Sequence, residues 1–155
     1  MFKYITLGIS LSFISWIVGM IINTFLIKTA LYNKRLTHLN FIKSKRLNRW
    51  IGIGLIKWVV KNTFFKFFNP NLKMKNKVEW GELDKIRQEM TLAEINHLIG
   101  FAFVSIFAIV FLFKGNYSSA SMVMLVNVIM NFYPSLLQQE NKRRIDKLKL
   151  IFFRN

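Results

Sequence analysis

The sequence contains no cysteine, and only seven acidic residues stand against 23 lysines and arginines, so the net charge is +16. Without cysteine there is neither a disulfide framework nor thiol chemistry. The chain is nevertheless 53% apolar, which excludes a disordered protein because disorder requires low hydrophobicity. A soluble nucleic-acid-binding protein is rarely so apolar, no recognisable nucleic-acid-binding module occurs, and no nucleic acid is expected as a partner. This composition is typical of a membrane protein with a basic cytoplasmic face.

Three apolar segments predict three membrane-spanning helices. Residues 5–27 carry no charged side chain, and as a helix they reach about 35 Å, enough for a hydrocarbon core of about 30 Å. A secretory signal peptide is the alternative, but the run is long for one and no typical cleavage site follows. Residues 98–113 and 120–137 are further apolar runs, and the polar turn from Lys114 to Ser119 predicts a helical hairpin. A hairpin buried in a soluble core is the alternative for these two.

The distribution of positive charge predicts the topology. Residues 28–78 contain 13 lysines and arginines and no acidic residue, whereas the hairpin turn carries only Lys114. The positive-inside rule therefore places the N-terminus and this turn outside, and the middle segment and C-terminus in the cytoplasm, as expected in a bacterial inner membrane. We expect an all-α integral membrane protein with a single domain over residues 1–155. It has a cytoplasmic and interfacial segment at 28–97 and a basic tail at 138–155.

The middle segment contains a second membrane-binding pattern. Residues 50–68 combine tryptophan and phenylalanine with Lys57, Lys61 and Lys66, which lie at spacings of four and five. This pattern predicts a basic amphipathic helix in the plane of the headgroups. Each lysine near an anionic leaflet contributes about 1 kcal/mol, so anionic lipid headgroups are expected partners. The helix either binds headgroups or an anionic substrate, or it serves the topology alone.

Polar residues at helical spacing flank the hairpin on its cytoplasmic side: Glu89, Glu94 and His97 before the second span, and Gln138, Asn141 and Arg144 after the third. In an antiparallel pair, residues at equal depth have numbers with a constant sum. Glu94 with Asn141 and His97 with Gln138 share the sum 235, so the two sets are expected to meet at one depth. A histidine oriented by a carboxylate acts as a general base toward a hydroxyl. Amides and an arginine hold a carbonyl oxygen or a phosphate, so this set suits acyl transfer to an alcohol.

Two alternatives remain for the same residues. Glu94 and His97 have the spacing of half a di-iron site, but such a site needs the motif twice, and the sequence has one copy. No metal and no other cofactor is therefore expected. A structural role is the second alternative, because polar residues in spans commonly make interhelical hydrogen bonds.

These residues resemble the motifs of a small membrane family, the glycosyl-4,4'-diaponeurosporenoate acyltransferases. One motif is matched in register by Glu89, Ala93, Glu94 and His97, and a second by Asn131, Gln138, Asn141 and Arg144. Leu92 stands where the first motif has arginine, and Gln139 and Glu140 stand where the second has an Arg-Tyr pair. The resemblance implies an acyltransferase of a carotenoid-type pathway, with an acyl donor and a lipid-like acceptor as partners.

The sequence therefore favours a membrane acyltransferase that moves a fatty acyl group onto a hydroxyl of a lipid-like acceptor, such as a glycosylated isoprenoid, at the cytoplasmic leaflet. The expected catalytic residues are His97 as base, Glu94 as its orienting group, and Glu89. The expected substrate-binding residues are Gln138, Asn141, Arg144, Asn131, Lys57 and Lys61. The alternative is a non-catalytic membrane protein, either a homo-oligomeric pore or a scaffold for a larger complex.

Overall fold

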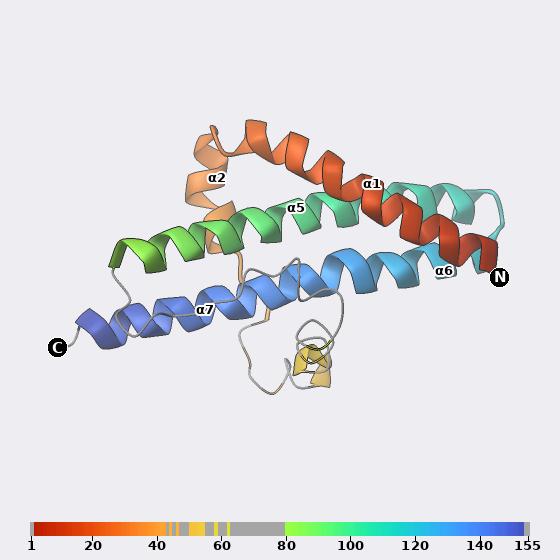
Figure 1. Cartoon of the computed structure of the whole chain (residues 1–155). Helices are drawn as coiled ribbons and strands as arrows, with labels where there is room; N and C mark the ends of the chain where they lie inside the picture. The colour runs from red at the N-terminus through yellow and green to blue at the C-terminus, as the bar shows by residue number, and fades with distance from the viewer. Residues whose placement is uncertain are drawn as a thin grey trace.

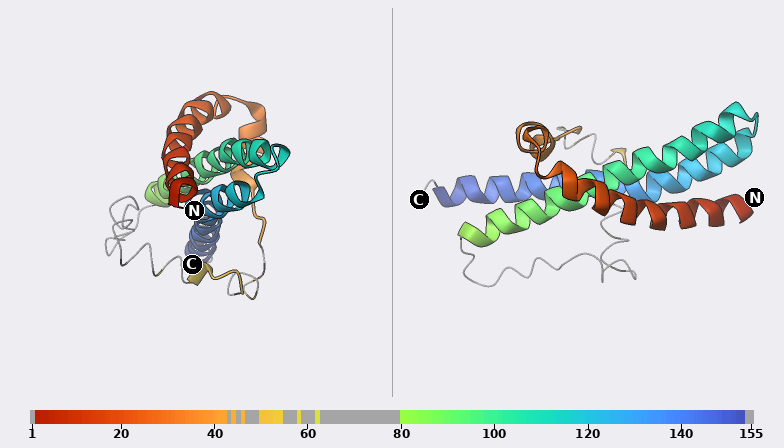
Figure 2. Two further views of the ribbon diagram at one scale, coloured as in Figure 1. Left: turned by 90° about the vertical axis from the view of Figure 1, so that its right-hand side faces the viewer. Right: turned by 90° about the horizontal axis from the view of Figure 1, so that it is seen from above.

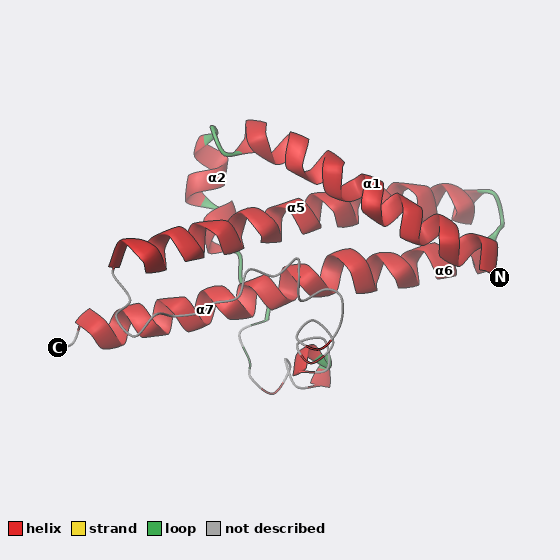
Figure 3. Ribbon diagram, in the orientation of Figure 1, coloured by secondary structure: helices red, strands yellow, loops and turns green. Residues whose placement is uncertain are grey.

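In the computed structural model the chain is described over residues 2–42 and 80–153, and between them at 44, 46, 50–54, 58 and 62 (Figure 1). The elements are α1 (Phe2–Leu26), α2 (Ala30–Lys34), the 3-10 helix η1 (Leu36–His38), α5 (Trp80–Phe113), α6 (Tyr117–Asn127), the π-helical turn η3 (Val128–Phe132) and α7 (Tyr133–Phe153). No strand occurs in these parts of the chain (Figure 3). Three stretches within them, Phe2–Leu26, Gly81–Phe113 and Tyr117–Ile151, are long and apolar enough to cross a membrane. The predicted all-α fold with three spans is confirmed.

The second and third spans form the predicted hairpin. Its turn is shorter than expected, because the chain re-enters a helix at Tyr117 rather than after Ser119. Gly115 takes φ 70°, a left-handed conformation that glycine adopts without steric cost. The Oδ1 atom of Asn116 then accepts hydrogen bonds from the Ser119 amide and hydroxyl, which caps α6 and satisfies its first free donors.

The third span is one long helix with a π turn in its middle. The amide of Tyr133 donates to the carbonyl of Val128, five residues earlier, instead of four. Pro134 follows directly, and its ring lacks an amide hydrogen and clashes with the carbonyl four residues before it. A single π turn absorbs this conflict, and such turns are frequent at functional sites. Asn131 lies within this turn and is buried.

Helix α1 packs across the hairpin through a stripe of small and polar residues. Its buried face consists of Gly8, Leu11, Ser12, Ser15, Gly19 and Asn23. A Cβ atom on Gly19 would lie 2.4 Å from the backbone oxygen of Asn96, so α1 and α5 are in backbone contact there. Small residues permit such close approach between membrane helices, where van der Waals packing replaces the hydrophobic effect. In Figure 2, α1 crosses α5 in the view from above.

The N-terminus and the hairpin turn lie at one end of the molecule, and the C-terminus lies at the other (Figure 1). The Asn116 amide donates to the Tyr4 hydroxyl at 3.5 Å, and the Tyr4 ring packs edge-on against Phe111. Helix α5 has 34 residues, or about 51 Å, which exceeds a hydrocarbon core of about 30 Å. The hairpin therefore extends beyond α1 at its charged end.

The segment after α1 folds back onto this extension. Thr29 caps α2 by accepting from the Tyr32 amide, and residues 36–42 then run alongside α7. Further on, the Tyr133 hydroxyl donates to the Ile51 carbonyl at 2.9 Å, and Ile53 is buried against Leu136 and Leu137. Residues 51 and 52 form a turn near the start of the predicted amphipathic helix. Residues 50, 53, 54, 58 and 62 of that prediction are helical, whereas Lys57, Lys61 and Lys66 lie outside the described residues.

Candidate functional site

The charged residues of the hairpin begin where its apolar runs end. Helix α5 carries no Asp, Glu, Lys, Arg or His from residue 98 to residue 113, and the third span carries none from residue 118 to residue 139. Glu94 lies four residues, or about 6 Å, beyond the apolar run of α5. A polar site at this position lies at the boundary between the apolar and the charged parts of the hairpin.

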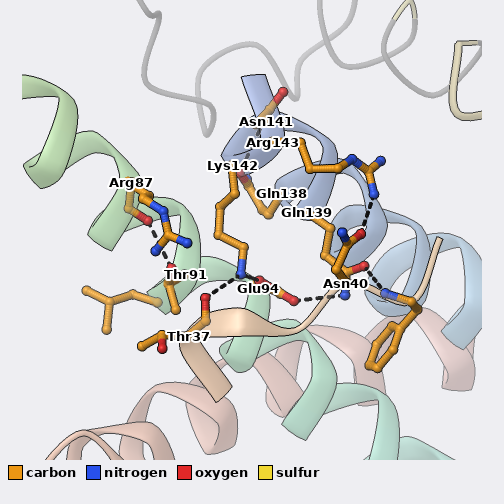
Figure 4. A network of polar contacts seen from close by, with 12 residues as sticks. Thr37, Asn40, Arg87, Thr91, Glu94, Gln138, Gln139, Asn141, Lys142 and Arg143 are labelled. Atoms are coloured by element: carbon orange, nitrogen blue, oxygen red, sulfur yellow. Dashed lines mark hydrogen bonds and ion pairs between the residues drawn. The ribbon is translucent and has the colours of Figure 1, made fainter. Parts of the chain in front are cut away.

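A buried ion pair joins the two helices at this boundary. The Lys142 Nζ atom pairs with Oε2 of Glu94, and the two side chains are only 4% and 0% exposed (Figure 4). Gln139 Nε2 donates to the other carboxylate oxygen at 2.8 Å, and Gln139 is 1% exposed. Burial of one charge alone costs several kcal/mol, so both partners and the amide are needed to keep this carboxylate charged inside the protein.

The same two α7 side chains bind the returning segment. Gln139 Oε1 accepts the Phe41 amide at 2.9 Å, and Lys142 Nζ donates to the Thr37 carbonyl at 3.3 Å. Glu94 is thereby linked through α7 to the backbone of residues 37–41, as Figure 4 shows. Tyr32 is also buried. Desolvation by burial raises the pKa of its phenol, and the negative charge of Glu94 raises it further, so the two side chains interact electrostatically. Glu94 therefore organises three separate parts of the chain.

A pocket of about 110 Å³ opens beside this network. Its lining residues come from the returning segment, α5 and α7: Thr37, His38, Leu39, Asn40, Arg87, Gln139, Lys142, Arg143 and Asp146. Arg87 pairs with Asp146 through Nε at 2.6 Å, with a longer second contact of 3.4 Å. Arg143 donates to Asn40 Oδ1 at 2.5 Å and to the Ile42 carbonyl.

A second polar cluster lies deeper in the bundle, around the π turn. Asn131 Nδ2 donates to Ser15 Oγ at 3.2 Å and to Asn127 Oδ1 at 2.9 Å. Asn127 in turn donates to the Phe101 carbonyl at 3.0 Å. Asn131 Oδ1 faces α5, since a Cβ atom on Gly100 would lie 2.9 Å from it. Both asparagines belong to the third span, and they join it to α1 through Ser15 and to α5 through Phe101.

His97 lies one turn before Gly100 on α5, and its side chain is hydrogen-bonded to Asn131. Both amide hydrogens of Asn131 are already donated, so Oδ1 is the atom that accepts from the imidazole. A hydrogen bond from one ring nitrogen of His97 to this oxygen would leave the other ring nitrogen with its lone pair. That tautomer is the one that a general base requires.

The structure pairs the predicted residues differently from the expectation. Gln139 and Lys142 face Glu94, whereas Asn141 donates to the neighbouring Gln138 at 3.5 Å on the next face of α7. The equal-depth pairs Glu94 with Gln139, Arg87 with Asp146, and Asp84 with Lys149 share the sum 233, so the expected sum of 235 is off by two residues. Because of this shift and the rotation of α7, Gln139 and Lys142 contact the Glu94 carboxylate in place of Gln138 and Asn141.

The remaining predicted residues have other surroundings. The side chain of His97 interacts with Asn131, whereas the two oxygens of Glu94 contact Gln139 and Lys142 on α7. Arg144 is 64% exposed and pairs with Glu140 at 3.5 Å, and Glu89 is exposed on α5. Within the described parts of the chain, no three potential metal ligands converge.

Sequence reasoning missed Gln139, Lys142, Arg143, Arg87 and Asn40. A usable signal existed, because opposite charges at constant sum fix the rotation of one helix against the other. Asp84 with Lys149 and Arg87 with Asp146 form such pairs, and both are ion pairs in the structure. Asn40 had no signal, because its place beside Arg143 depends on the path of the returning segment.

The fold and this site define a multi-pass helical membrane protein with a buried charged network at the end of its hairpin. The model of the glycosyl-4,4'-diaponeurosporenoate acyltransferase family matches residues 28–149, and the chain belongs to that family. The matched range begins after α1 and contains every residue of the two polar clusters except Ser15. No curated protein matches the chain, and no solved structure does.

Proposed function

We propose that the protein is an acyltransferase that moves a fatty acyl group from a thioester or lipid donor onto a hydroxyl of a lipid-like, carotenoid-type acceptor. The observation that carries this proposal is the family match over residues 28–149 together with a histidine held as a free base at the membrane boundary. The family description names a glycosylated acceptor, and a sugar hydroxyl is the nucleophile that suits this chemistry.

In the proposed reaction, His97 is the general base. Its free ring nitrogen accepts the proton of the acceptor hydroxyl as the hydroxyl oxygen attacks the acyl carbonyl carbon. The new C–O bond forms, the bond from the carbonyl carbon to the donor sulfur or oxygen breaks, and the proton passes from His97 to the leaving group. Asn131 is a positioning residue, because it accepts the opposite ring N–H and fixes the tautomer.

Glu94 has a different proposed role from the one that its spacing suggested. Its carboxylate is fully occupied by Lys142 and Gln139, so it does not exchange protons with a substrate. Glu94 instead positions the returning segment, through Gln139 to Phe41 and through Lys142 to Thr37. Loss of this carboxylate is expected to open the pocket side of the site and to leave the imidazole in place.

The proposed reaction takes place at the cytoplasmic leaflet of the cell membrane, with the N-terminus outside and the C-terminus inside. The strongly basic segment after α1 supports this orientation. Because the chain has no cysteine, a single introduced one is labelled alone. In intact cells, Ser118→Cys is expected to react with an impermeant maleimide, and Lys147→Cys only after permeabilisation. The reverse pattern would overturn the orientation.

The activity is tested with purified protein, an acyl thioester and glycosyl-4,4'-diaponeurosporenoate, and in cells by lipid and pigment profiling. Wild type is expected to produce a species heavier by one acyl group, and His97→Ala is expected to lose it. Gln88→Ala, an exposed change on the same helix, is the matched control and retains the product. Identical profiles at equal membrane levels would reject the enzyme and favour the non-catalytic alternative.

A further inference from the structure

The pocket beside Glu94 has an unbalanced charge. Three of its lining residues are cations: Arg87, Lys142 and Arg143. Arg87 is neutralised by Asp146 and Lys142 by Glu94. Within the described parts of the chain, the partners of Arg143 are neutral oxygens, those of Asn40 and Ile42. The pocket therefore carries one excess positive charge, and it is located on Arg143.

Arg143 also has unused hydrogen-bonding capacity. Its Nη1 atom makes both of the contacts just described, while its Nη2 atom is buried and has no hydrogen-bond partner. A buried donor without a partner is unfavourable, and an acceptor oxygen of a ligand would satisfy it. A guanidinium with a free edge matches the oxygens of a phosphate in geometry as well as in charge.

The pocket has the size and the neighbours of a small oxyanion site. Its volume of about 110 Å³ is well above the ~10–15 Å³ that a cavity needs to hold one water molecule. Thr37, Asn40 and Gln139 supply further polar groups around it. A phosphate group is small enough for this volume and would have these polar groups around it.

The pocket lies on the charged side of His97 along α5. Arg87 lies ten residues before His97 on one continuous helix, which is about 15 Å along its axis on the charged side. A molecule with its charged group in the pocket would extend toward His97 and the apolar bundle beyond. An acyl donor has this shape, with a phosphate at one end and a fatty chain at the other.

We propose that the pocket lined by Arg143, Asn40, Gln139 and Arg87 binds the phosphate group of the acyl donor. The proposal rests on the proposed function and deepens it, since it gives the donor a phosphate and a fixed direction. The same chemistry occurs in two donor classes, a soluble nucleotide-type thioester and a phospholipid. In both classes the phosphate pairs with the guanidinium of Arg143, which lines the pocket.

Direct binding tests the proposal without turnover. Full-length protein in a phosphate-free detergent is titrated by calorimetry with coenzyme A and, separately, with a short-chain phosphatidylglycerol below its micelle concentration. One probe is expected to bind at one site, with affinity reduced about tenfold or more by Arg143→Gln, the loss expected for a charge-assisted contact. Lys147→Gln removes an exposed charge from the same helix and is expected to leave binding unchanged.

The outcomes distinguish a soluble thioester donor from a phospholipid donor, and they test the phosphate site separately from the acyltransferase function. Binding of coenzyme A alone indicates a soluble thioester donor, and binding of phosphatidylglycerol alone indicates a lipid donor. No binding of either probe, or equal losses in Arg143→Gln and Lys147→Gln, would overturn the inference. Arg143-dependent binding in a protein without transfer activity rejects the proposed function and keeps the phosphate site. If Arg143→Gln transfers the acyl group with an unchanged KM for the donor, the proposed function is kept and the phosphate site is rejected.

A second measurement covers the case in which Arg143→Gln does not fold. Phenylglyoxal modification of wild-type Arg143 is followed by peptide mass spectrometry with and without the probe that binds. The bound probe is expected to slow modification of Arg143 and to leave the exposed Arg144 unaffected. Equal modification rates of Arg143 in both samples would contradict the site.

Discussion

Lys142 on α7 forms an ion pair with Glu94 on α5, and both side chains are almost completely buried. The chain has seven acidic residues and a net charge of +16, so composition alone does not indicate which of the many cations pairs with a buried carboxylate. The fold selects one lysine because the hairpin places it opposite the carboxylate. The pair, with Gln139, fixes the rotation of α7 against α5 and anchors the segment that closes the site.

Removal of one partner of this pair is expected to be more harmful than removal of both. Lys142→Met leaves the Glu94 carboxylate buried without a counter-charge and should lower the free energy of unfolding by about 3–5 kcal/mol. Adding Glu94→Gln to it should recover part of the loss, because a neutral amide needs no cation. Unfolding in mixed micelles, followed by tryptophan fluorescence, measures the three variants. Lys147→Met, an exposed change, should stay within about 0.5 kcal/mol of wild type. Additive losses would contradict the coupling.

The close contact of α1 with α5 predicts a large effect of one added methyl group. In Gly19→Ala the new Cβ atom would lie 2.4 Å from the Asn96 backbone oxygen, so the helices must separate. Overpacking of this kind costs about 1–3 kcal/mol and should lower the thermal midpoint in detergent. Gly81→Ala is the matched control, since nothing lies within 4 Å of its Cβ position. If both variants melt alike, the helices do not approach as described.

Substitution of Asn131 should lower kcat more than it changes the KM of the acceptor. Asn131→Ala removes the oxygen that holds the His97 tautomer, so kcat is expected to fall about 10- to 100-fold, a part of the ~10²–10⁴ that general bases contribute. The KM of the acceptor should be unchanged. Ser15→Ala removes one hydrogen bond from the same amide and leaves Oδ1 in place, so its loss should be smaller. Equal losses of kcat in the two variants would assign Asn131 a purely structural role.

The raised pKa of Tyr32 predicts that the free energy of unfolding falls at high pH. Burial raises the pKa of its phenol, and the Glu94 carboxylate raises it further. Below the unfolded pKa of about 10 the phenol is neutral in both states. As the pH rises from there through the higher folded pKa, the unfolded chain loses the proton first, and stability falls. The thermal midpoint of Tyr32→Phe should therefore fall less between pH 9 and 11 than that of wild type. Tyr117→Phe, which removes an exposed phenol, should behave as wild type does.

Much of the fold could be predicted because it depends on periodicity and length. Apart from Ile27, which follows the last residue of α1, the apolar runs at 5–27, 98–113 and 120–137 lie within the three helices that can span a membrane. The turn near Gly115 lies between the second and third. The helix end at Tyr117 could not be placed, because it depends on the Asn116 cap. The π turn is a comparable case, since Pro134 indicates a distortion but not its form.

The candidate site was predicted in part. His97, Glu94 and Asn131 all have buried or half-buried polar environments in the structure. Their partners were not predicted, because Gln138 and Gln139 are equally polar and lie on adjacent faces of one helix, about 100° apart. Periodicity gives the depth of each residue to within a turn and leaves the rotation of the helix open.

The sequence by itself determined the class of protein, the spans, the basic character of one end, and the family motifs that include His97 and Glu94. Only the tertiary structure decided that Lys142 neutralises Glu94, that Asn131 holds His97, and that Arg143 has a free edge in a small pocket. The physical reason is that composition and hydrophobic periodicity act along one helix at a time. The choice of partner depends on how three helices and a returning segment rotate and pack against one another.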